Sequence, residues 1–478
     1  MSENIKPDLK KARKRTKDSI ETTEYRFNPI YETLGKGRTY FIETHGCQAN
    51  EADSERLRGL LEKAGFKKGK KVETSDVVII NTCAVRKTAE NKVFGEIGRL
   101  KGFKRKHDDM ILAIGGCMPQ EENVTRRLTE EFDQVDIVFG THNLHRFLDL
   151  LAQKLKSDHQ VVEVMSKEGS LVEKVPSARE SRFKAWVDIM HGCDEFCTYC
   201  IVPYTRGRER SREPWYIKKE VLELIDRGYK EITLLGQNVN SYGLDFQDSD
   251  YGFADLLRDL SKLTIPRIRF TTSHPKDFTD DIIEVLATGG NLMPYIHLPV
   301  QSGSDRVLKR MNRKYTKKHY LDRIRKIKTL IPGVSISTDI IVGFPGETEA
   351  DFEETIDLVE TVGFEGAFTF IYSPREGTPA AGYPDTVTRE EKKRRLMRLN
   401  EIVAADSLKG NKRFEEKNVP VLVEGPSKTN KDKLTGYTPH HKRVNFTGDE
   451  KLVGHIVDVH ITEAKTWSLD GVADETND

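Results

Sequence analysis

The sequence of 478 residues lacks any run of about 18 consecutive apolar residues, the length that a membrane-spanning helix needs. Its first 20 residues are charged and lack the apolar segment of a secretory signal peptide. Net charge is almost absent too, at +1 at pH 7, so any surface for an anionic partner has to be local. These absences predict a cytoplasmic protein that does not bind membranes.

Cysteine is also rare, at six residues of 478. Disulfide bonds could use all six, but thiols stay reduced in the cytosol, where a large chain without an export signal is expected. Three of the six lie within the stretch HGCDEFCTYC, and the other three stand apart from one another. We therefore expect metal or redox chemistry from these cysteines.

Apolar strand-like runs alternate with amphipathic helical runs between residue 38 and about residue 150. This alternation predicts βαβ units and an open parallel sheet. The strand-like runs are 38–47, 76–83, 110–117 and 135–143, and helical runs cover 50–66 and 88–103.

Cys47, Cys83 and Cys117 each come just after one of these strands. The carboxyl ends of parallel strands share one edge of the sheet, where ligand sites of open α/β sheets lie, so the three thiols can converge. Gly46 and the pair 115–116 would let the backbone approach a bound group closely. The alternative is three buried cysteines that act as small apolar side chains.

A polar stretch over 153–182 is typical of a linker, and a second alternation of strands and helices follows it. Six βα units predict a partial (βα)6 barrel whose chemistry lies at the carboxyl ends of its strands. The predicted strands are 184–190, 231–236, 267–273, 295–300, 335–344 and 366–373.

A basic helical segment over 388–417 precedes short strands whose spacing predicts a small antiparallel β barrel. Basic groups in this region interleave with Tyr437 and Phe446, which fits an RNA-binding surface or a merely solvated face. The basic groups are Lys428, Lys431, Lys433, His440, His441, Lys442 and Arg443. The predicted chain order is a basic, disordered leader over 1–37, then domains over 38–156, 179–409 and 412–475.

The spacing Cys193-x3-Cys197-x2-Cys200 packs three thiolates into one loop. Zinc would need a fourth ligand, and His191 has poor spacing for that role. Thiolates also suit iron–sulfur clusters, and three of them leave one iron of a 4Fe–4S cube open to a substrate. The position directly after the first strand of a βα barrel favours the cluster.

With Tyr199 before its last cysteine, this motif resembles that of radical S-adenosylmethionine (SAM) enzymes. In that family the amino and carboxylate groups of SAM bind the open iron. The reduced cluster then breaks SAM into methionine and a 5′-deoxyadenosyl radical, which abstracts a hydrogen atom.

Three further cysteines before the barrel and a C-terminal barrel of TRAM type make the chain similar to radical SAM methylthiotransferases, from residue 38 to about residue 470. The motifs THGCQAN, NTCAVR, GGC and HLPVQSGS fit the family pattern. VPYTRG, residues 202–207, resembles the members that act on dimethylallyl-adenosine beside the tRNA anticodon. Pro119 stands where alanine is expected, at a position that is not a ligand.

The resemblance implies a sulfur-transferring enzyme that inserts a methylthio group at carbon 2 of N6-(dimethylallyl)adenosine at tRNA position 37. It implies two 4Fe–4S clusters, one on each cysteine set, and SAM as methyl donor and radical source. The cluster on Cys47, Cys83 and Cys117 would carry the sulfur. The implied partners are the tRNA anticodon stem-loop, a flavodoxin- or ferredoxin-type reductant and sulfur- or cluster-supply proteins. No exposed heptad seam indicates obligate assembly, so we expect a monomer.

Polar residues at successive strand ends are candidates for contact with SAM or substrate, although each alone is more often a loop or capping residue. His297, inside an apolar strand, could instead be a hydrogen-bonded core histidine. The candidates are Tyr199, Gln237, Asn238, Asn240, Ser273, His274, His297, Gln301, Ser302, Asp339, Gly343, Phe344 and Glu347.

Arginine forks match phosphate and carboxylate groups, so a row of alternating arginines after the triplet predicts contact with tRNA phosphate or with the SAM carboxylate. Its alternative is a charged solvent face. The predicted RNA contacts are Arg206, Arg208, Arg210, Lys442 and Arg443, with Arg212 in the same row.

Other functions fit parts of the pattern. The same chemistry could act on another tRNA adenosine or on a ribosomal-protein aspartate. A non-catalytic iron–sulfur electron carrier would use four protein ligands per cluster and would need no barrel. A zinc-stabilised RNA-binding module is the remaining alternative.

Overall fold

The structure is a computed structural model that describes residues 20–85, 87–165, 170–428 and 430–473. The chain divides into two compact units. The N-terminal unit consists of Met1–Glu180, Met190–Arg212 and Ser373–Ala381. The barrel unit consists of Ser181–Ile189, Glu213–Tyr372 and Gly382–Asp478.

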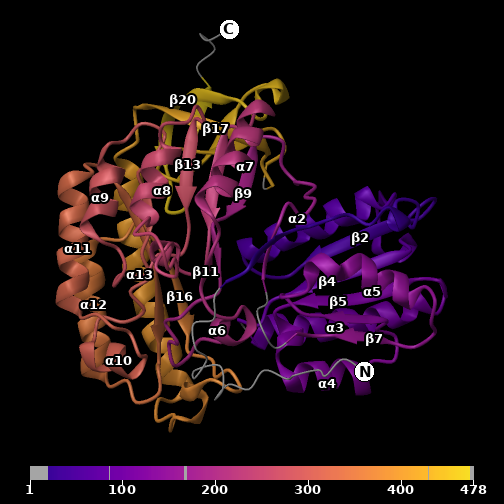
Figure 1. The fold of residues 1–478 in the computed structure, drawn as a ribbon. Helices are drawn as coiled ribbons and strands as arrows, with labels where there is room; N and C mark the ends of the chain where they lie inside the picture. The colour runs from indigo at the N-terminus through magenta and orange to yellow at the C-terminus, as the bar shows by residue number, and fades with distance from the viewer. Residues whose placement is uncertain (1–19, 86, 166–169, 429, 474–478) are drawn as a thin grey trace. The chain divides into compact units, whose positions relative to one another are not determined.

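A six-stranded sheet with the order β3-β2-β4-β5-β6-β7 forms the centre of the N-terminal unit (Figure 1). Every neighbouring pair is parallel, which confirms the predicted open parallel sheet. The strands are β2 (Thr39–Thr44), β3 (Lys67–Lys68), β4 (Val77–Thr82), β5 (Ile111–Gly116), β6 (Ile137–Phe139) and β7 (Val161–Glu163).

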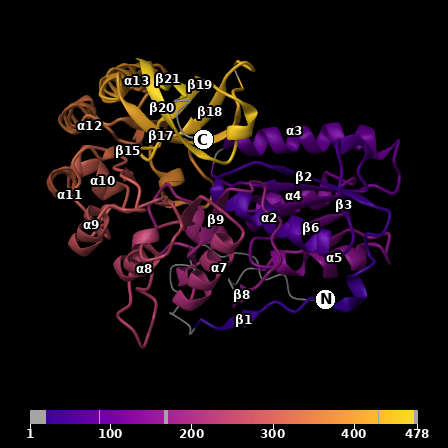
Figure 2. The same cartoon turned by 90° about the horizontal axis from the view of Figure 1, so that it is seen from above.

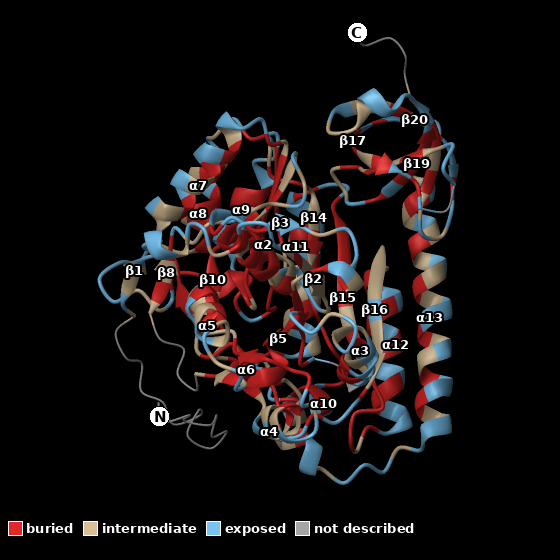
Figure 3. Cartoon of the chain, turned by 90° about the vertical axis from the view of Figure 1, so that its right-hand side faces the viewer, coloured by how far each residue is buried: buried red, intermediate tan, exposed pale blue. Residues whose placement is uncertain are grey.

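Helices cover both faces of this sheet, so its central strands are buried along their whole length (Figure 3). Successive side chains of a strand point to opposite faces. Val77 and Ile79 accordingly pack with Leu60 on one face, whereas Val78 and Ile80 pack into a second core on the other. The helices are α2 (Gln48–Lys63), α3 (Lys87–Lys104), α4 (Glu122–Glu130) and α5 (Phe147–Lys154).

Two predictions for polar stretches were wrong. Residues 20–37 of the predicted leader contain β1 (Thr22–Glu24), which pairs in parallel with β8 (Leu171–Glu173). Tyr25 and Phe27, which follow β1, pack against the core of the unit. Burial of these aromatic side chains orders the segment in spite of its charged residues. The predicted linker 153–182 supplies β7 and β8. The rest of the leader, 1–19, lies outside the described residues.

The cysteine-triplet loop is closed by a short hairpin within the N-terminal unit. Its strands β10 (Met190–His191) and β11 (Arg210–Ser211) pair antiparallel, and α6 (Val202–Thr205) lies between them. The preceding strand β9 (Lys184–Asp188) belongs to the barrel unit. The loop therefore follows a barrel strand, as predicted, but packs with the residues of the other unit.

The barrel unit contains the six predicted strands as two parallel sheets of three, β13-β12-β9 and β14-β15-β16. A bridge between Ile268 and Leu292 continues the first sheet toward β14. Helices line the outer side of these strands (Figure 2). The strands beyond β9 are β12 (Glu231–Leu235), β13 (Arg267–Phe270), β14 (Tyr295–His297), β15 (Ser335–Val342) and β16 (Gly366–Ile371). The helices are α7 (Pro214–Asp226), α8 (Phe253–Leu260), α9 (Asp280–Ala287), α10 (Asp305–Arg310), α11 (Lys317–Leu330), α12 (Glu349–Val362) and α13 (Arg389–Lys412).

A closed five-stranded barrel with the order β17-β18-β19-β21-β20 ends the chain. It differs from the predicted antiparallel barrel in one pair, because β19 and β21 run parallel. Arg267 on β13 attaches it to the rest of the barrel unit by donating to the carbonyl groups of Tyr437 and Pro420. The strands are β17 (Asn418–Pro426), β18 (Leu434–Tyr437), β19 (Arg443–Thr447), β20 (Ile456–Ala464) and β21 (Leu469–Ala473).

No helix within the described ranges combines the length and the apolar character that crossing a membrane requires.

Close packing at Gly115 yields a test of the sheet. A Cβ atom there would lie 2.1 Å from the ring of Phe139, whereas a Cβ atom on Gly98, on α3, meets nothing within 4 Å. We expect Gly115→Ala to lower the free energy of unfolding by about 1–3 kcal/mol through overpacking. Gly98→Ala should raise it by about 0.5–1 kcal/mol through helix propensity. Urea midpoints at unchanged slope measure both effects, and equal midpoints for Gly115→Ala and wild type would contradict the packing.

Candidate functional site

Cys47, Cys83 and Cys117 lie at one edge of the N-terminal sheet, after the neighbouring strands β2, β4 and β5. Cys47 caps the start of α2, and Cys117 precedes a short 3-10 turn. Burial, with the charges of Cys117 and Cys47, raises the pKa of the Cys83 thiol to about 12. The three sulfurs are thus close enough to interact, and the structure brings the predicted set together.

A buried amide network supports this edge. Asn50 on α2 donates to the carbonyl oxygen of Thr82 at 3.0 Å, and Asn81 on β4 donates to the carbonyl oxygen of Asn50 at 2.8 Å. Gly116 has a φ of +96°, and a Cβ atom there would lie 2.4 Å from the Thr82 carbonyl oxygen. The network fixes the backbone beside all three cysteines. Sequence reasoning missed both asparagines, although Asn81 in the apolar run VVIINT was a usable signal.

The triplet loop places its own three thiols together. The amide of Cys193 donates to the carbonyl oxygen of Gly207 at 3.1 Å, and the amide of Cys200 donates to that of Cys197 at 3.0 Å. Burial raises the pKa of the Cys193 thiol well above its usual value, and the charges of Glu209, Cys197 and Cys200 raise it further.

The two cysteine sets share a wall inside the N-terminal unit. Cys117 packs in one apolar cluster with Ile201 and Tyr204, which directly follow the triplet. Arg206 lies beside the same thiol, forms a hydrogen bond with it and pairs with Asp53 on α2 at 2.8 Å between Nη2 and Oδ2. Opposite charges around this buried guanidinium raise its pKa well above the usual value, so Arg206 remains charged.

The segment 373–381 ties the surroundings of both sets together. Arg375 donates to the carbonyl oxygen of Val85 at 3.0 Å and forms a buried ion pair with Glu90 on α3 at 3.1 Å. In the same segment, the amide of Ala380 donates to the carbonyl oxygen of Thr198, inside the triplet loop, at 2.8 Å. One stretch of chain thus contacts the turn after Cys83 and the loop between Cys197 and Cys200.

The donor geometry fits iron–sulfur clusters better than single ions. Three thiolates around one zinc ion, with Zn–S bonds of about 2.3 Å, would lie about 3.8 Å from one another. Within the described residues, neither cysteine set gathers its three sulfurs within 4.8 Å. None of the six cysteines, all of which lie in the described ranges, forms a disulfide bond. Burial, together with neighbouring negative charges, raises the pKa of Cys83 and of Cys193, and bonding to iron would stabilise the thiolate form of both.

The arginine row after the triplet is less exposed than a solvent face would be. Arg206, Arg210 and Arg212 are buried, and Arg212 forms two 2.6 Å bonds with Glu173. Arg208 is half-buried and pairs with Asp194. Only Arg210 lies in the hairpin of β10 and β11, whereas Arg206 follows α6. RNA contact stays a prediction for this row, and Arg208 is the member with the greatest exposure.

Buried polar atoms gather at the ends of β12 and β13 in the barrel unit. Asn238 donates to Asp277 at 2.8 Å, and Asn240 accepts from the amide of His274 at 3.0 Å. The Asn238 Oδ1, Asn240 Nδ2 and Ser273 Oγ atoms are buried without a hydrogen-bond partner among the described residues. A ligand that satisfies them would remove this cost. These predicted residues therefore fit a SAM site, and the half-buried Gln237 lies beside them.

The strands β14, β15 and β16 present a second group of candidates on one face. His297 bonds to Ser337 at 2.9 Å through Nδ1 and lies 3.5 Å from Asp339 through Nε2. Asp339 stands opposite the exposed Phe368 in the strand register. Gln301 uses its backbone to pair with Asp339 and Ile341 and adopts a φ of +69°.

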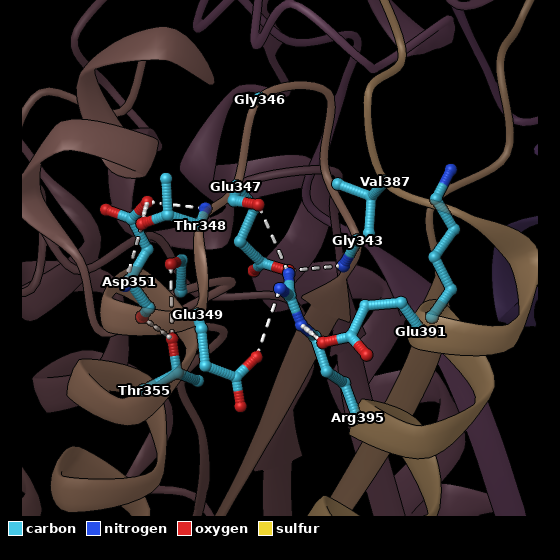
Figure 4. A network of polar contacts seen from close by, with 12 residues as sticks. Gly343, Gly346, Glu347, Thr348, Glu349, Asp351, Thr355, Val387, Glu391 and Arg395 are labelled. Atoms are coloured by element: carbon cyan, nitrogen blue, oxygen red, sulfur yellow. Dashed lines mark hydrogen bonds and ion pairs between the residues drawn. The ribbon is translucent and has the colours of Figure 1, made fainter.

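Glu347 has a role that the sequence did not indicate. Its buried carboxylate accepts from the amide of Gly343 at 2.6 Å and from Arg395 on α13 at 2.8 Å (Figure 4). Arg395 also pairs with Glu391 and Glu349. The carboxylate thus holds the turn after β15 against α13, and contact of Glu347 with SAM has no support from this geometry. Gly343, Phe344 and Ser302 are buried as well.

The two predicted RNA contacts of the C-terminal barrel differ in exposure. Lys442 is buried and pairs with Glu365 at 2.8 Å, so its ammonium group serves the fold. Arg443 is exposed, and its guanidinium lies 5.9 Å from the centre of the Tyr437 ring. The Tyr437 ring stacks on the His441 ring, with 4.9 Å between the ring centres. Arg443 and this pair of rings remain the candidates for base stacking.

Known families match three parts of the chain. The Radical SAM superfamily matches residues 187–359, the Uncharacterized protein family UPF0004 matches residues 39–140, and the TRAM domain matches residues 412–473. Membership of the Radical SAM superfamily implies a 4Fe–4S cluster and SAM for this chain.

Curated relatives match nearly the whole chain. A tRNA-2-methylthio-N(6)-dimethylallyladenosine synthase of Oceanobacillus iheyensis is 54% identical over 467 residues, which cover 98% of this chain and 90% of the relative. The chain belongs to this synthase family. Synthases of the same name from Bacillus subtilis and Geobacillus kaustophilus are 54% and 53% identical to this chain. Each match covers 98% of this chain, and the two matches cover 92% and 88% of the respective relative. The predicted methylthiotransferase resemblance is confirmed.

Solved structures share only the fold with this synthase family member. The radical S-adenosylmethionine methyltransferase TsrM from Kitasatospora setae has a TM-score of 0.52 at 14% identity, over 72% of this chain and 75% of that one. The cobalamin-dependent S-adenosylmethionine radical enzyme OxsB has a TM-score of 0.50 at 16% identity, over 79% and 57%. Both confirm the α/β architecture of the chain.

Differences in burial predict how fast the cysteines of the cluster-free protein react with iodoacetamide at pH 8. The thiolate is the reactive form, and Cys83 is buried with a pKa of about 12, whereas Cys47 is exposed. We expect Cys47 to be alkylated at least about tenfold faster than Cys83. Peptide mass spectrometry measures both rates, and the urea-denatured protein serves as the control in which the two thiols react alike. Equal rates in the folded protein would contradict the buried position of Cys83.

Proposed function

We propose that this protein inserts a methylthio group at carbon 2 of N6-(dimethylallyl)adenosine at position 37 of tRNA. The observation that carries the proposal is the placement of two sets of three cysteines in one compact unit, where Ile201, Tyr204 and Arg206, which follow the triplet, contact Cys117. An electron carrier would not need two three-thiolate sets with a common wall. The names of the curated relatives support the same reaction.

Each cysteine set supplies three thiolates, and we propose that each holds a 4Fe–4S cluster with one open iron. When bound, the clusters supply the electron that cleaves SAM and the site that presents the sulfur. The protein's part is to fix both positions. The amide network of Asn50 and Asn81 orders the strand ends, and the backbone bonds from Cys193 and Cys200 order the triplet loop.

SAM is held, in this proposal, by polar atoms at the strand ends of the barrel unit. Asn238, Asn240 and Ser273 offer buried hydrogen-bonding atoms that have no partner among the described residues. His297 and Asp339 offer a polar pair on the face that also carries Phe368. Tyr199 and Gln301 remain further predictions for this site. Contact of Glu347 with SAM also remains a prediction, and its Oε2 atom accepts from Arg395 and from the Gly343 amide.

The TRAM domain and the family support tRNA as the partner. Carbon 2 of adenine is inaccessible inside a helix, whereas anticodon loops offer unstacked bases that can be turned into a pocket. Arg443 with Tyr437 and His441 provides a cation and aromatic rings on the C-terminal barrel. A reductant of flavodoxin or ferredoxin type, sulfur- or cluster-supply proteins, a monomeric state and a cytoplasmic location remain predictions.

Nucleoside analysis tests the function directly. In a strain that lacks this gene, we expect the tRNA to accumulate N6-(dimethylallyl)adenosine and to lose its methylthio derivative, because the enzyme that adds the group is then absent. A plasmid copy should restore the product, whereas copies with Cys117→Ala or Cys193→Ala should not. Only Cys117→Ala should still release 5′-deoxyadenosine from SAM in vitro, since it leaves the triplet intact.

Retention of the methylthio nucleoside in the deletion strain would refute the assignment. In that case, tryptic digests of ribosomal proteins from the deletion strain and from the wild type would be compared by mass spectrometry. A methylthio-aspartate that is present only in the wild type would indicate the alternative substrate.

Iron content tests the pair of clusters. After anaerobic reconstitution we expect about eight irons per chain in the wild type, from two cubes with three cysteine ligands each. The triple variant Cys193→Ala/Cys197→Ala/Cys200→Ala should hold about four, and so should Cys47→Ala/Cys83→Ala/Cys117→Ala. Iron and sulfide assays give the counts. A triple variant that keeps the full complement would contradict the two-cluster arrangement.

A further inference from the structure

Phe368 is exposed on the inner face of the barrel unit. Its strand, β16, packs on α13 through the other face (Figure 3), where Thr369 donates to the side chain of Asn400 at 2.6 Å. Successive side chains of a strand point to opposite faces, so Phe368 points away from α13. Its side chain is 59% exposed there. Side chains fill the interior of a closed βα barrel, so an exposed phenylalanine on this face marks a part that is left open.

The side chains around Phe368 change from polar to apolar along the strands. Phe368 stands opposite Asp339 in the register, and its ring contacts that of His297 edge to face, with 5.9 Å between the ring centres. Nearer the carboxyl ends, Ile341 and Phe370 stand opposite each other on the same face, and both are half-buried. The apolar part of the face therefore lies toward the strand ends at which barrel enzymes carry out their chemistry.

Polar groups that suit SAM lie on the other sheet of the barrel unit. Asn238, Asn240 and Ser273, beyond the ends of β12 and β13, carry buried polar atoms that have no hydrogen-bond partner among the described residues. The face around Phe368 offers an aromatic ring and aliphatic carbon instead. An apolar group gains most from such a surface, because both partners lose contact with water.

We propose that Phe368 contacts the dimethylallyl group of the target adenosine and determines the specificity for it. The inference rests on the proposed function, whose substrate differs from unmodified adenosine by this one branched apolar group. Moving its five carbon atoms from water onto the ring is favourable in proportion to the apolar area removed from water. Unmodified adenosine gains nothing from the same contact, so Phe368 selects the modified tRNA and takes no part in the bond-breaking steps.

Binding of two anticodon stem-loops to the reconstituted holoenzyme tests this role. The RNAs carry N6-(dimethylallyl)adenosine or adenosine at position 37 and are otherwise identical, and anaerobic fluorescence anisotropy gives their Kd values. We expect the wild type to bind the modified RNA at least about tenfold more tightly, because one methylene group alone can be worth about tenfold. Phe368→Ala should reduce this ratio to about twofold or less, whereas Phe368→Leu, which keeps an apolar side chain, should retain most of it.

Three further variants serve as controls. Phe368→Gln replaces the ring by a polar side chain and should lower the ratio as Phe368→Ala does, which keeps the test decisive if the alanine variant does not fold. Met397 on α13 is 64% exposed, so Met397→Ala removes a similarly exposed apolar side chain and should leave the ratio unchanged. Arg443→Gln, on the C-terminal barrel, should weaken both RNAs alike. Thermal unfolding midpoints should match the wild type, since exposed side chains contribute little to stability.

Several results would overturn the inference. One is a wild type that binds both RNAs alike, and another is a wild-type ratio in the alanine and glutamine variants of Phe368. An equal loss of affinity for both RNAs would make Phe368 a stacking surface for the base. A higher Kd for SAM with an unchanged RNA ratio would assign the ring to SAM.

Failure of the proposed function has a different signature. The wild type would then form no methylthio nucleoside from the modified stem-loop in a turnover assay, whatever the ratio of the two Kd values. A wild type that forms this product, together with an unchanged ratio in the Phe368 variants, would overturn the role of Phe368 alone.

Discussion

The buried charge of Arg206 is the constraint on which the cysteine architecture depends. A guanidinium removed from water is costly unless it is paired, so Arg206 needs Asp53 on α2 and the Cys117 thiol at the same time. Because Arg206 closely follows the triplet, satisfying it fixes the triplet loop against the edge of the N-terminal sheet. The apolar contact of Cys117 with Ile201 and Tyr204 strengthens the same junction.

Strands with long apolar runs were predictable because the apolar side chains that mark them in the sequence are the same ones whose burial stabilises them. The run VVIINT became β4, buried on both faces, and the six barrel strands followed the same logic. Short strands at sheet edges carry no such signal: β7 and β1 contain three residues each and bury only part of their surface. Their pairing is decided by neighbours distant in the sequence, which no local pattern contains.

The six cysteines could be chosen as candidate ligands from the sequence because only cysteine supplies a thiolate. The residues that support them could not be chosen in this way. The roles of Asn50 and Arg375 depend on partners in other parts of the chain. Asn50 bonds to Thr82, and Arg375 pairs with Glu90. Glu347 also has a protein partner that its own sequence context does not indicate. A carboxylate after a barrel strand suggests a ligand contact, but the arrival of Arg395 from α13 gives it a partner within the protein.

The chain passes between the two units at residues 181, 190, 213, 373 and 382, so neither is a single stretch of the gene. Cutting at the apparent linker would leave the first fragment without the triplet loop and without residues 373–381. A fragment starting there would carry the triplet without the sheet that packs against it. Dissection into separately expressed modules, which suits many multidomain enzymes, is therefore unsuited to this one, because both cysteine sets depend on the continuous polypeptide.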